Sequence, residues 1–163
     1  MQIQLNWKSD ILTNNYKIYQ NNREIGFIKK DFFSQKANAE INGKKYIFKE
    51  RGLFNQETDI IDEAGNNIIG EIRYNFWGNK ASIEINDIKT SWEYTNLWNT
   101  QWSVTGDENL NIFFSKSSRN IESNTDDELQ ILSGLYVYNH YYSQLVIAML
   151  VIIIPICIRN LSH

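Results

Sequence analysis

Few side chains in this sequence are of the kinds that carry out chemistry, and they lie far apart. The 163 residues include two histidines, His140 and His163, and one cysteine, Cys157. A metal site in a protein needs three or four His, Cys or carboxylate ligands at close spacing, and neither histidine has such neighbours. We therefore expect no metal site, a hydrogen-bonded core histidine at position 140, and an inert apolar role for Cys157.

Carboxylates and glycines give an equally weak signal for catalysis. Asp59, Asp62 and Glu63 form a cluster that could bind Ca²⁺ or move protons, but their spacing fits no calcium-binding loop. A solvated hairpin end is the favoured interpretation. The glycines at turns or within strands match neither nucleotide-binding fingerprint: Gly65, Gly70 and Gly78. We therefore expect a non-enzymatic protein that has no cofactor.

Charge is spread unevenly along the chain. Residues 1–51 carry ten Lys and Arg against five Asp and Glu, whereas residues 52–163 carry six against fourteen. A basic surface can bind the phosphates of lipid or nucleic acid, although solvent-facing strand positions are the favoured interpretation. The acidic remainder argues against nucleic-acid binding. The candidate lipid- or anion-binding residues are Lys29, Lys30, Lys36, Lys44, Lys45, Lys49 and Arg51.

Aromatic residues gather between positions 92 and 102. Trp92, Trp98 and Trp102 lie close together in the sequence, with Tyr94 among them. If exposed, such residues stack on bases or sugars, or rest at a membrane interface. Packing in a hydrophobic core is the favoured interpretation.

Short strands and tight turns must position these side chains. Asn42-Gly43 is the strongest hairpin signal, because both central residues of a type I′ turn need a positive φ. Regular spacing of strands with turn signals predicts a sandwich or barrel of ten to twelve antiparallel strands. We expect strands over 16–19, 24–28, 39–41, 46–48, 59–62, 68–74, 81–85, 88–94, 101–105, 110–114 and 119–122.

The C-terminal segment is helical in character and almost wholly apolar. Residues 123–128 offer cap residues and carboxylates that favour a helix start. Residues 129–142 are apolar on every face, as in a helix enclosed by protein or lipid. Residues 145–158 carry no charge and would extend about 21 Å, and 141–161 about 31 Å, against a bilayer core of about 30 Å. A short membrane span and a buried core helix are both consistent with this length.

The order of elements resembles the tubby-like fold, which includes tubby proteins, phospholipid scramblases and LURP-one-related proteins. The resemblance rests on the strand count, the terminal helix, and the acidic lead-in Asp126-Asp127-Glu128 before the apolar run Leu129-Gln130-Ile131-Leu132-Ser133-Gly134-Leu135. It implies a closed antiparallel β-barrel of twelve strands around a hydrophobic C-terminal helix. Phospholipid contact in some relatives is a further implication. The chain is shorter than typical members of that fold.

We therefore expect a barrel domain over 1–142, with a central helix at about 126–142, and a hydrophobic extension or tail anchor over 143–163. Ser133 and Gly134 suit close contact between this helix and the barrel walls. The alternative places 145–158 inside the barrel and leaves 127–142 as a surface helix.

Two functions follow from this arrangement. The first is a membrane-associated domain that contacts anionic phospholipid, and the second is a soluble scaffold whose apolar helix packs in the core, on a partner chain or on a second copy. Residues 1–7 lack the features of a signal peptide, and we expect a cytoplasmic domain attached to the inner membrane of a bacterium. The anchor residues would be Leu145, Val146, Ile147, Met149, Leu150, Val151, Ile152, Ile153, Ile154, Ile156 and Ile158.

Overall fold

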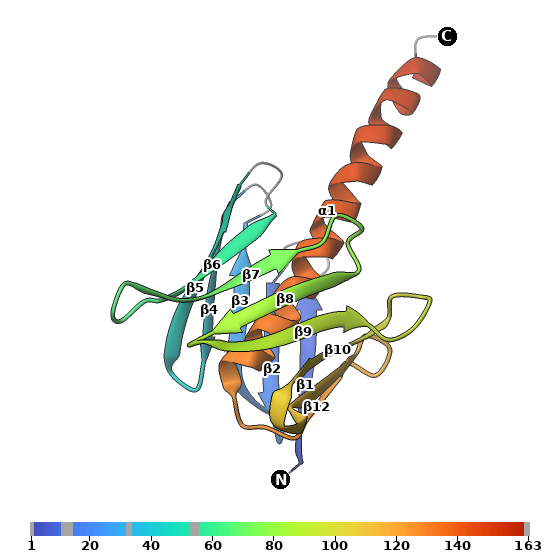
Figure 1. Cartoon of the computed structure of the whole chain (residues 1–163). Helices are drawn as coiled ribbons and strands as arrows, with labels where there is room; N and C mark the ends of the chain where they lie inside the picture. Colours follow the sequence, from blue (N-terminus) through green and yellow to red (C-terminus); the bar gives the residue numbers. More distant parts are fainter. Residues whose placement is uncertain (1, 11–14, 32–33, 53–55, 162–163) are drawn as a thin grey trace.

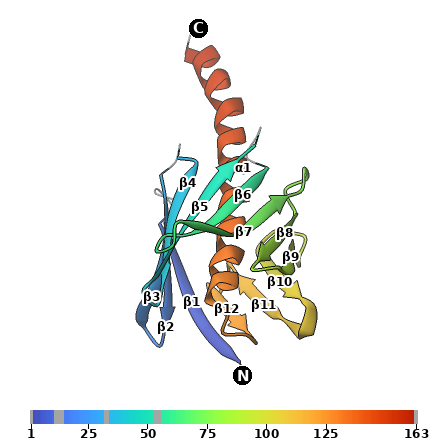
Figure 2. The ribbon, with the colours of Figure 1, turned by 60° about the vertical axis from the view of Figure 1, so that its left-hand side comes forward.

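Twelve antiparallel strands form a closed barrel around one long helix (Figures 1 and 2). The computed structural model describes residues 2–10, 15–31, 34–52 and 56–161. The strands are β1 (Ile3–Asp10), β2 (Asn15–Gln20), β3 (Arg23–Lys30), β4 (Lys36–Ile41), β5 (Lys44–Arg51), β6 (Glu57–Asp62), β7 (Asn67–Tyr74), β8 (Lys80–Ile85), β9 (Ile88–Tyr94), β10 (Gln101–Gly106), β11 (Asn111–Ser115) and β12 (Asn120–Ser123). The predicted fold class is therefore confirmed.

Alternation of side chains along each strand gives the barrel an apolar interior. In β4 the buried residues are Ala37, Ala39 and Ile41, and the residues between them face outward. The turns between strands use residues that accept a positive φ, as the sequence predicted. Asn42 and Gly43 have φ values of 47° and 82°, which suit the tight turn between β4 and β5.

Strand β1 closes the barrel, and it was not among the predicted strands. It pairs with β12, where Leu5 lies opposite Ile121, and with β2, where Trp7 lies opposite Ile18. Leu5 and Trp7 are buried inside the barrel. This double pairing leaves no open sheet edge, which is how a barrel avoids edge-to-edge aggregation.

The interior of the barrel is filled by the first half of helix α1 (Glu128–Leu161). Asp127 caps the start of the helix, because its Oδ1 accepts hydrogen bonds from the backbone amides of Leu129 and Gln130, each at 3.1 Å. Residues 129–141 are all buried. The helix then continues without a break out of the barrel (Figure 2), as the first of the two predicted arrangements requires.

Two similar segments of sequence build neighbouring parts of the wall. Residues 22–45 cover β3, β4 and the start of β5, and residues 66–89 cover β7, β8 and the start of β9. Gly26 and Gly70 hold equivalent places, and a Cβ on either would lie about 2.5 Å from a backbone oxygen of the next strand. Eleven positions are identical: Asn22/Asn66, Ile25/Ile69, Gly26/Gly70, Ile28/Ile72, Phe32/Phe76, Lys36/Lys80, Ala37/Ala81, Glu40/Glu84, Ile41/Ile85, Asn42/Asn86 and Lys45/Lys89.

Candidate functional site

The barrel has two different ends, which the path of α1 distinguishes. At the far end the helix begins, and Glu128 contacts Asn42 and Lys44 in the turn between β4 and β5. At the exit end the helix leaves the barrel, and the Tyr141 hydroxyl donates to Asn75 Oδ1 at 3.2 Å. The described connections from β7 to β8, from β9 to β10 and from β11 to β12 lie at the exit end.

Beyond Ser143, most of the described side chains of helix α1 are exposed. We call residues 144–161 the tail helix. The exposed fraction is 67% for Val151, 63% for Ile152, and 52% for both Ile153 and Ile154. Leu145, Ile147, Met149 and Leu150 are exposed as well, Val146 is half-buried, and the side chains of Ile156 and Ile158 lie outside the described residues. Within the part of the chain that the structure describes, α1 is long and apolar enough to cross a membrane. Its first half is enclosed by the barrel, so the tail helix is the part available to do so.

Two loops at the exit end expose further large apolar side chains. Phe76 and Trp77 lie between β7 and β8, and they are 85% and 82% exposed. Leu97 and Trp98 lie between β9 and β10, and they are 98% and 84% exposed. We call these four residues the aromatic rim.

The three aromatic residues of the rim, Phe76, Trp77 and Trp98, and the base of the tail helix line one shared hollow of about 500 Å³. Its lining includes Trp77, Trp98, Tyr142 and Leu145. Lys116 lies at its edge, with Nζ 5.1 Å from the centre of the Tyr142 ring. Aromatic side chains from the two loops therefore share this hollow with the base of the tail helix.

The far end has a different chemistry. Its described turns include Asn21-Asn22, Asn42-Gly43 and Asn86-Asp87, which are polar and exposed. Large apolar side chains that are exposed near this end are Ile68 and Ile88 on strands β7 and β9. Exposed aromatic residues among the described part of the chain belong to the exit end.

The basic residues singled out in the sequence do not form one cationic face. The interpretation of Lys30 as a candidate lipid- or anion-binding residue was wrong. Its side chain is buried inside the barrel beside Glu50. Arg51 is neutralised on the outer wall by carboxylates: Glu57 at 2.7 Å, Asp59 at 2.7 Å and Glu71 at 2.9 Å.

The other five lysines divide between the two ends. Lys44 and Lys45 lie at the far end, next to Glu128 and opposite Glu40. Lys29, Lys36 and Lys49 are exposed on the part of the wall that leads to the exit end, and Lys36 lies directly opposite Lys49.

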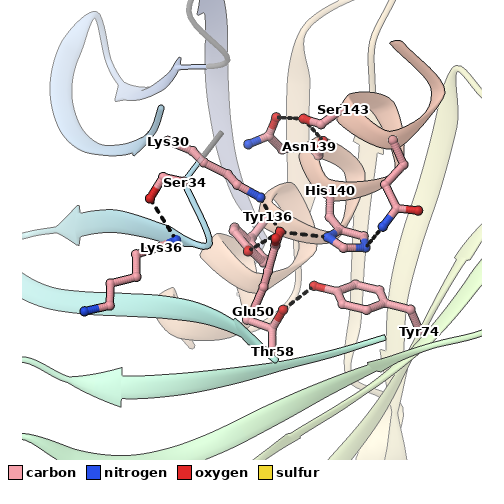
Figure 3. A network of polar contacts seen from close by, with 11 residues as sticks. Lys30, Ser34, Lys36, Glu50, Thr58, Tyr74, Tyr136, Asn139, His140 and Ser143 are labelled. Carbon is pink, nitrogen blue, oxygen red and sulfur yellow. Dashed lines mark hydrogen bonds and ion pairs between the residues drawn. The ribbon is translucent and has the colours of Figure 1, made fainter. Parts of the chain in front are cut away.

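A buried charge cluster joins the helix to the wall just inside the exit end (Figure 3). The carboxylate of Glu50, on β5, contacts Lys30 Nζ, accepts a hydrogen bond from the Tyr136 hydroxyl at 3.1 Å, and lies 3.0 Å from His140 Nδ1. Burial alone would raise the pKa of Glu50, but the hydrogen bond from His140 and the charge of Lys30 outweigh it and lower that pKa to about 2. Glu50 is therefore ionised at neutral pH.

Both ring nitrogens of His140 have a hydrogen-bonding partner. Nδ1 lies 3.0 Å from the Glu50 carboxylate, and Nε2 lies 3.0 Å from the side-chain amide of Gln144. The ring also stacks on Tyr74, with 3.8 Å between ring centres, and the Tyr74 hydroxyl lies 2.9 Å from Thr58 Oγ1. The prediction of a hydrogen-bonded core histidine is therefore confirmed.

The charge cluster contains acid–base groups that are almost wholly buried. The exposed fraction is 7% for Lys30, 4% for Glu50 and 2% for His140. The edge of His140 reaches a hollow of about 280 Å³ that Tyr74, Tyr141 and Gln144 also line. Within the described ranges, no three His, Cys, Asp or Glu side chains are placed to hold a metal ion. The contacts of the cluster link the helix to the barrel wall.

The remaining candidates occupy ordinary positions. Trp92 and Trp102 are fully buried, as the sequence interpretation favoured, whereas Trp98 is exposed. Asp59 pairs with Arg51, and Asp62 accepts the backbone amide of Ala64 at 3.2 Å in a hairpin end. Cys157 is an exposed residue of the tail helix, and His163 lies outside the described residues.

Comparison with protein-family models, curated proteins and solved structures finds no match for this chain. The similarity to the tubby-like fold therefore rests on architecture, namely a twelve-stranded antiparallel barrel with an apolar C-terminal helix.

Proposed function

We propose that this protein is a non-enzymatic barrel domain that the tail helix anchors in a lipid bilayer, with the barrel on the cytoplasmic side. The observation that carries the proposal is the exposure of four consecutive residues, Val151 to Ile154, each more than half exposed. Successive residues of a helix point about 100° apart, so four in a row cover every side. The tail helix thus has no polar face.

The absence of a polar face favours lipid over a partner chain. A helix that docks on one protein surface buries one side and keeps polar residues on the other. Lipid surrounds a helix completely and accepts apolar side chains all round. Each large aliphatic side chain gains about 1.5–3 kcal/mol when it leaves water completely.

The dimensions of the tail helix agree with this proposal. Eighteen residues, 144–161, extend about 27 Å, which is close to the hydrocarbon core of about 30 Å. Arg159 lies in the last turn, where a long cationic side chain reaches the opposite headgroups. Pro155 lies within the helix, as proline more often does in spanning helices than in soluble ones.

Contact with anionic phospholipid is the finer part of the proposal. Lys29, Lys36 and Lys49 are exposed on the wall that leads to the exit end, and Lys116 lies at the exit end itself. A cationic side chain near an anionic membrane surface contributes about 1 kcal/mol. Lys44 and Lys45, at the far end, would face away from the membrane.

Fractionation of cells that express the full chain tests the anchor. We expect the protein in the membrane fraction, resistant to an alkaline carbonate wash and released by detergent. A soluble monomer in detergent-free buffer would refute the proposal. A soluble oligomer would instead support the alternative, in which the tail helix packs on a second copy or a partner chain.

A further inference from the structure

We propose that the aromatic rim is a second membrane contact, which inserts Phe76, Trp77, Leu97 and Trp98 into the interface of the bilayer that the tail helix enters. The exit end of the barrel would then contact the membrane surface directly, in addition to the anchor that the tail helix provides. The inference rests on the proposed function, because the rim needs the same bilayer.

The two loops that carry the rim are built in the same way. Their sequences are Asn75-Phe76-Trp77-Gly78-Asn79 and Asn96-Leu97-Trp98-Asn99-Thr100. In each loop the first asparagine closes the turn with its side chain. Asn75 Oδ1 accepts the amides of Asn79 and Lys80, each at 3.1 Å. Asn96 Oδ1 accepts the amides of Thr100 and Gln101 at 3.0 and 3.2 Å.

The fourth residue of each loop also has the same backbone conformation. Gly78 and Asn99 have φ values of 69° and 53°, in the left-handed region that glycine and asparagine accept. The apolar pair lies at positions two and three, held out by a turn that is closed around the asparagine. Two loops that are not neighbours in sequence thus display an apolar residue followed by tryptophan in one geometry.

The position of the rim selects lipid as its partner. Trp77 and Trp98 line the same hollow as Leu145, the first large apolar residue of the tail helix. When the tail helix spans a bilayer, Leu145 at its base lies at the depth of the lipid headgroups. The residues around Leu145 then lie at the same depth. Tryptophan favours that depth, because its ring is apolar and its indole N–H remains able to reach water or headgroups.

Tryptophan fluorescence in the full-length protein tests the inference. The chain has five tryptophans, and Trp7, Trp92 and Trp102 are buried in the barrel. The protein would be reconstituted in phosphatidylcholine and phosphatidylglycerol vesicles whose acyl chains carry bromine, a short-range quencher. We expect quenching of the wild type and loss of most of that quenching in the double variant Trp77→Phe, Trp98→Phe.

A reporter at the far end is the matched control. Ile68→Trp, placed in the double variant, adds an exposed tryptophan at a position that is 65% exposed and distant from the tail helix. We expect that reporter to show no bromolipid quenching. Equal quenching of the wild type and the double variant would refute membrane contact by the aromatic rim, but it would not contradict the membrane anchor. Failure of the full chain to enter vesicles at all would overturn the proposed function and the rim together.

Discussion

The ring of Phe114, on β11, occupies the space that a side chain on Gly134 would need. An ideal Cβ on Gly134 would lie 2.5 Å from Phe114 Cζ, closer than real Cβ contacts. The same glycine exposes its carbonyl to the indoles of Trp92 and Trp102, whose Nε1 atoms donate to it at 2.9 and 3.2 Å. Gly134 therefore sets how close the helix comes to the wall.

Replacing this glycine should destabilise the barrel. Replacement of an exposed glycine within a helix by alanine stabilises a protein by up to about 1 kcal/mol. For Gly134→Ala we expect the opposite sign, a loss of about 1–3 kcal/mol, because the added methyl overpacks the core. Urea unfolding of the full chain in detergent measures the change. Phe114→Leu in the same background should restore part of the loss, and a Gly134→Ala protein as stable as the wild type would contradict the packing described here.

The buried charge cluster should contribute strongly to stability. Glu50→Gln leaves the charge of Lys30 buried without its carboxylate, and breaking such a pair costs about 3–5 kcal/mol. The matched control is Glu24→Gln, which breaks the exposed pair with Lys17. That pair contributes little to stability, because solvent screens it. Similar losses in both variants by urea unfolding would show that the cluster is not stabilising.

Stability should also fall in acid through Glu50. Its pKa is lowered from 4.5 to about 2 in the folded protein, so the folded state favours the ionised form. The stabilisation is present above pH 4.5 and is lost as the pH falls toward 2. A shift of this size corresponds to about 3 kcal/mol. The difference in unfolding free energy between wild type and Glu50→Gln should therefore shrink between pH 5 and pH 3, and a constant difference would contradict this assignment.

Local pattern was enough to predict most of the barrel, and particular residues show where it failed. Asn42-Gly43 and Asn86-Asp87 mark tight turns because their backbones need a positive φ, so the strands beside them were found. Strand β1 was missed, although Leu5 and Trp7 alternate with polar residues. Of its two partners, β12 lies far along the chain, and only closure of the barrel brings β1 and β12 together.

The candidate site was harder to predict, because it depends on which face of a strand each residue takes. Lys30 belongs to a run of basic residues, but it lies on the inward face, two positions after buried Ile28. Glu50 follows buried Phe48 in the same way and could have been found from that alternation. Trp98 resembles Trp92 and Trp102 in the sequence, but it lies in a loop and not on a strand.

A charge in the middle of the tail helix should release the protein from the membrane. An arginine at the centre of a spanning helix costs about 2.5–3.5 kcal/mol on insertion, so we expect Ile152→Arg to move a large part of the protein into the soluble fraction. Gln144→Arg is the matched control, because it lies at the base of the tail helix, where the guanidinium reaches the headgroups. Carbonate-washed membranes assayed for both variants measure the effect. Retention of Ile152→Arg at the level of Gln144→Arg would mean that position 152 does not lie in the bilayer.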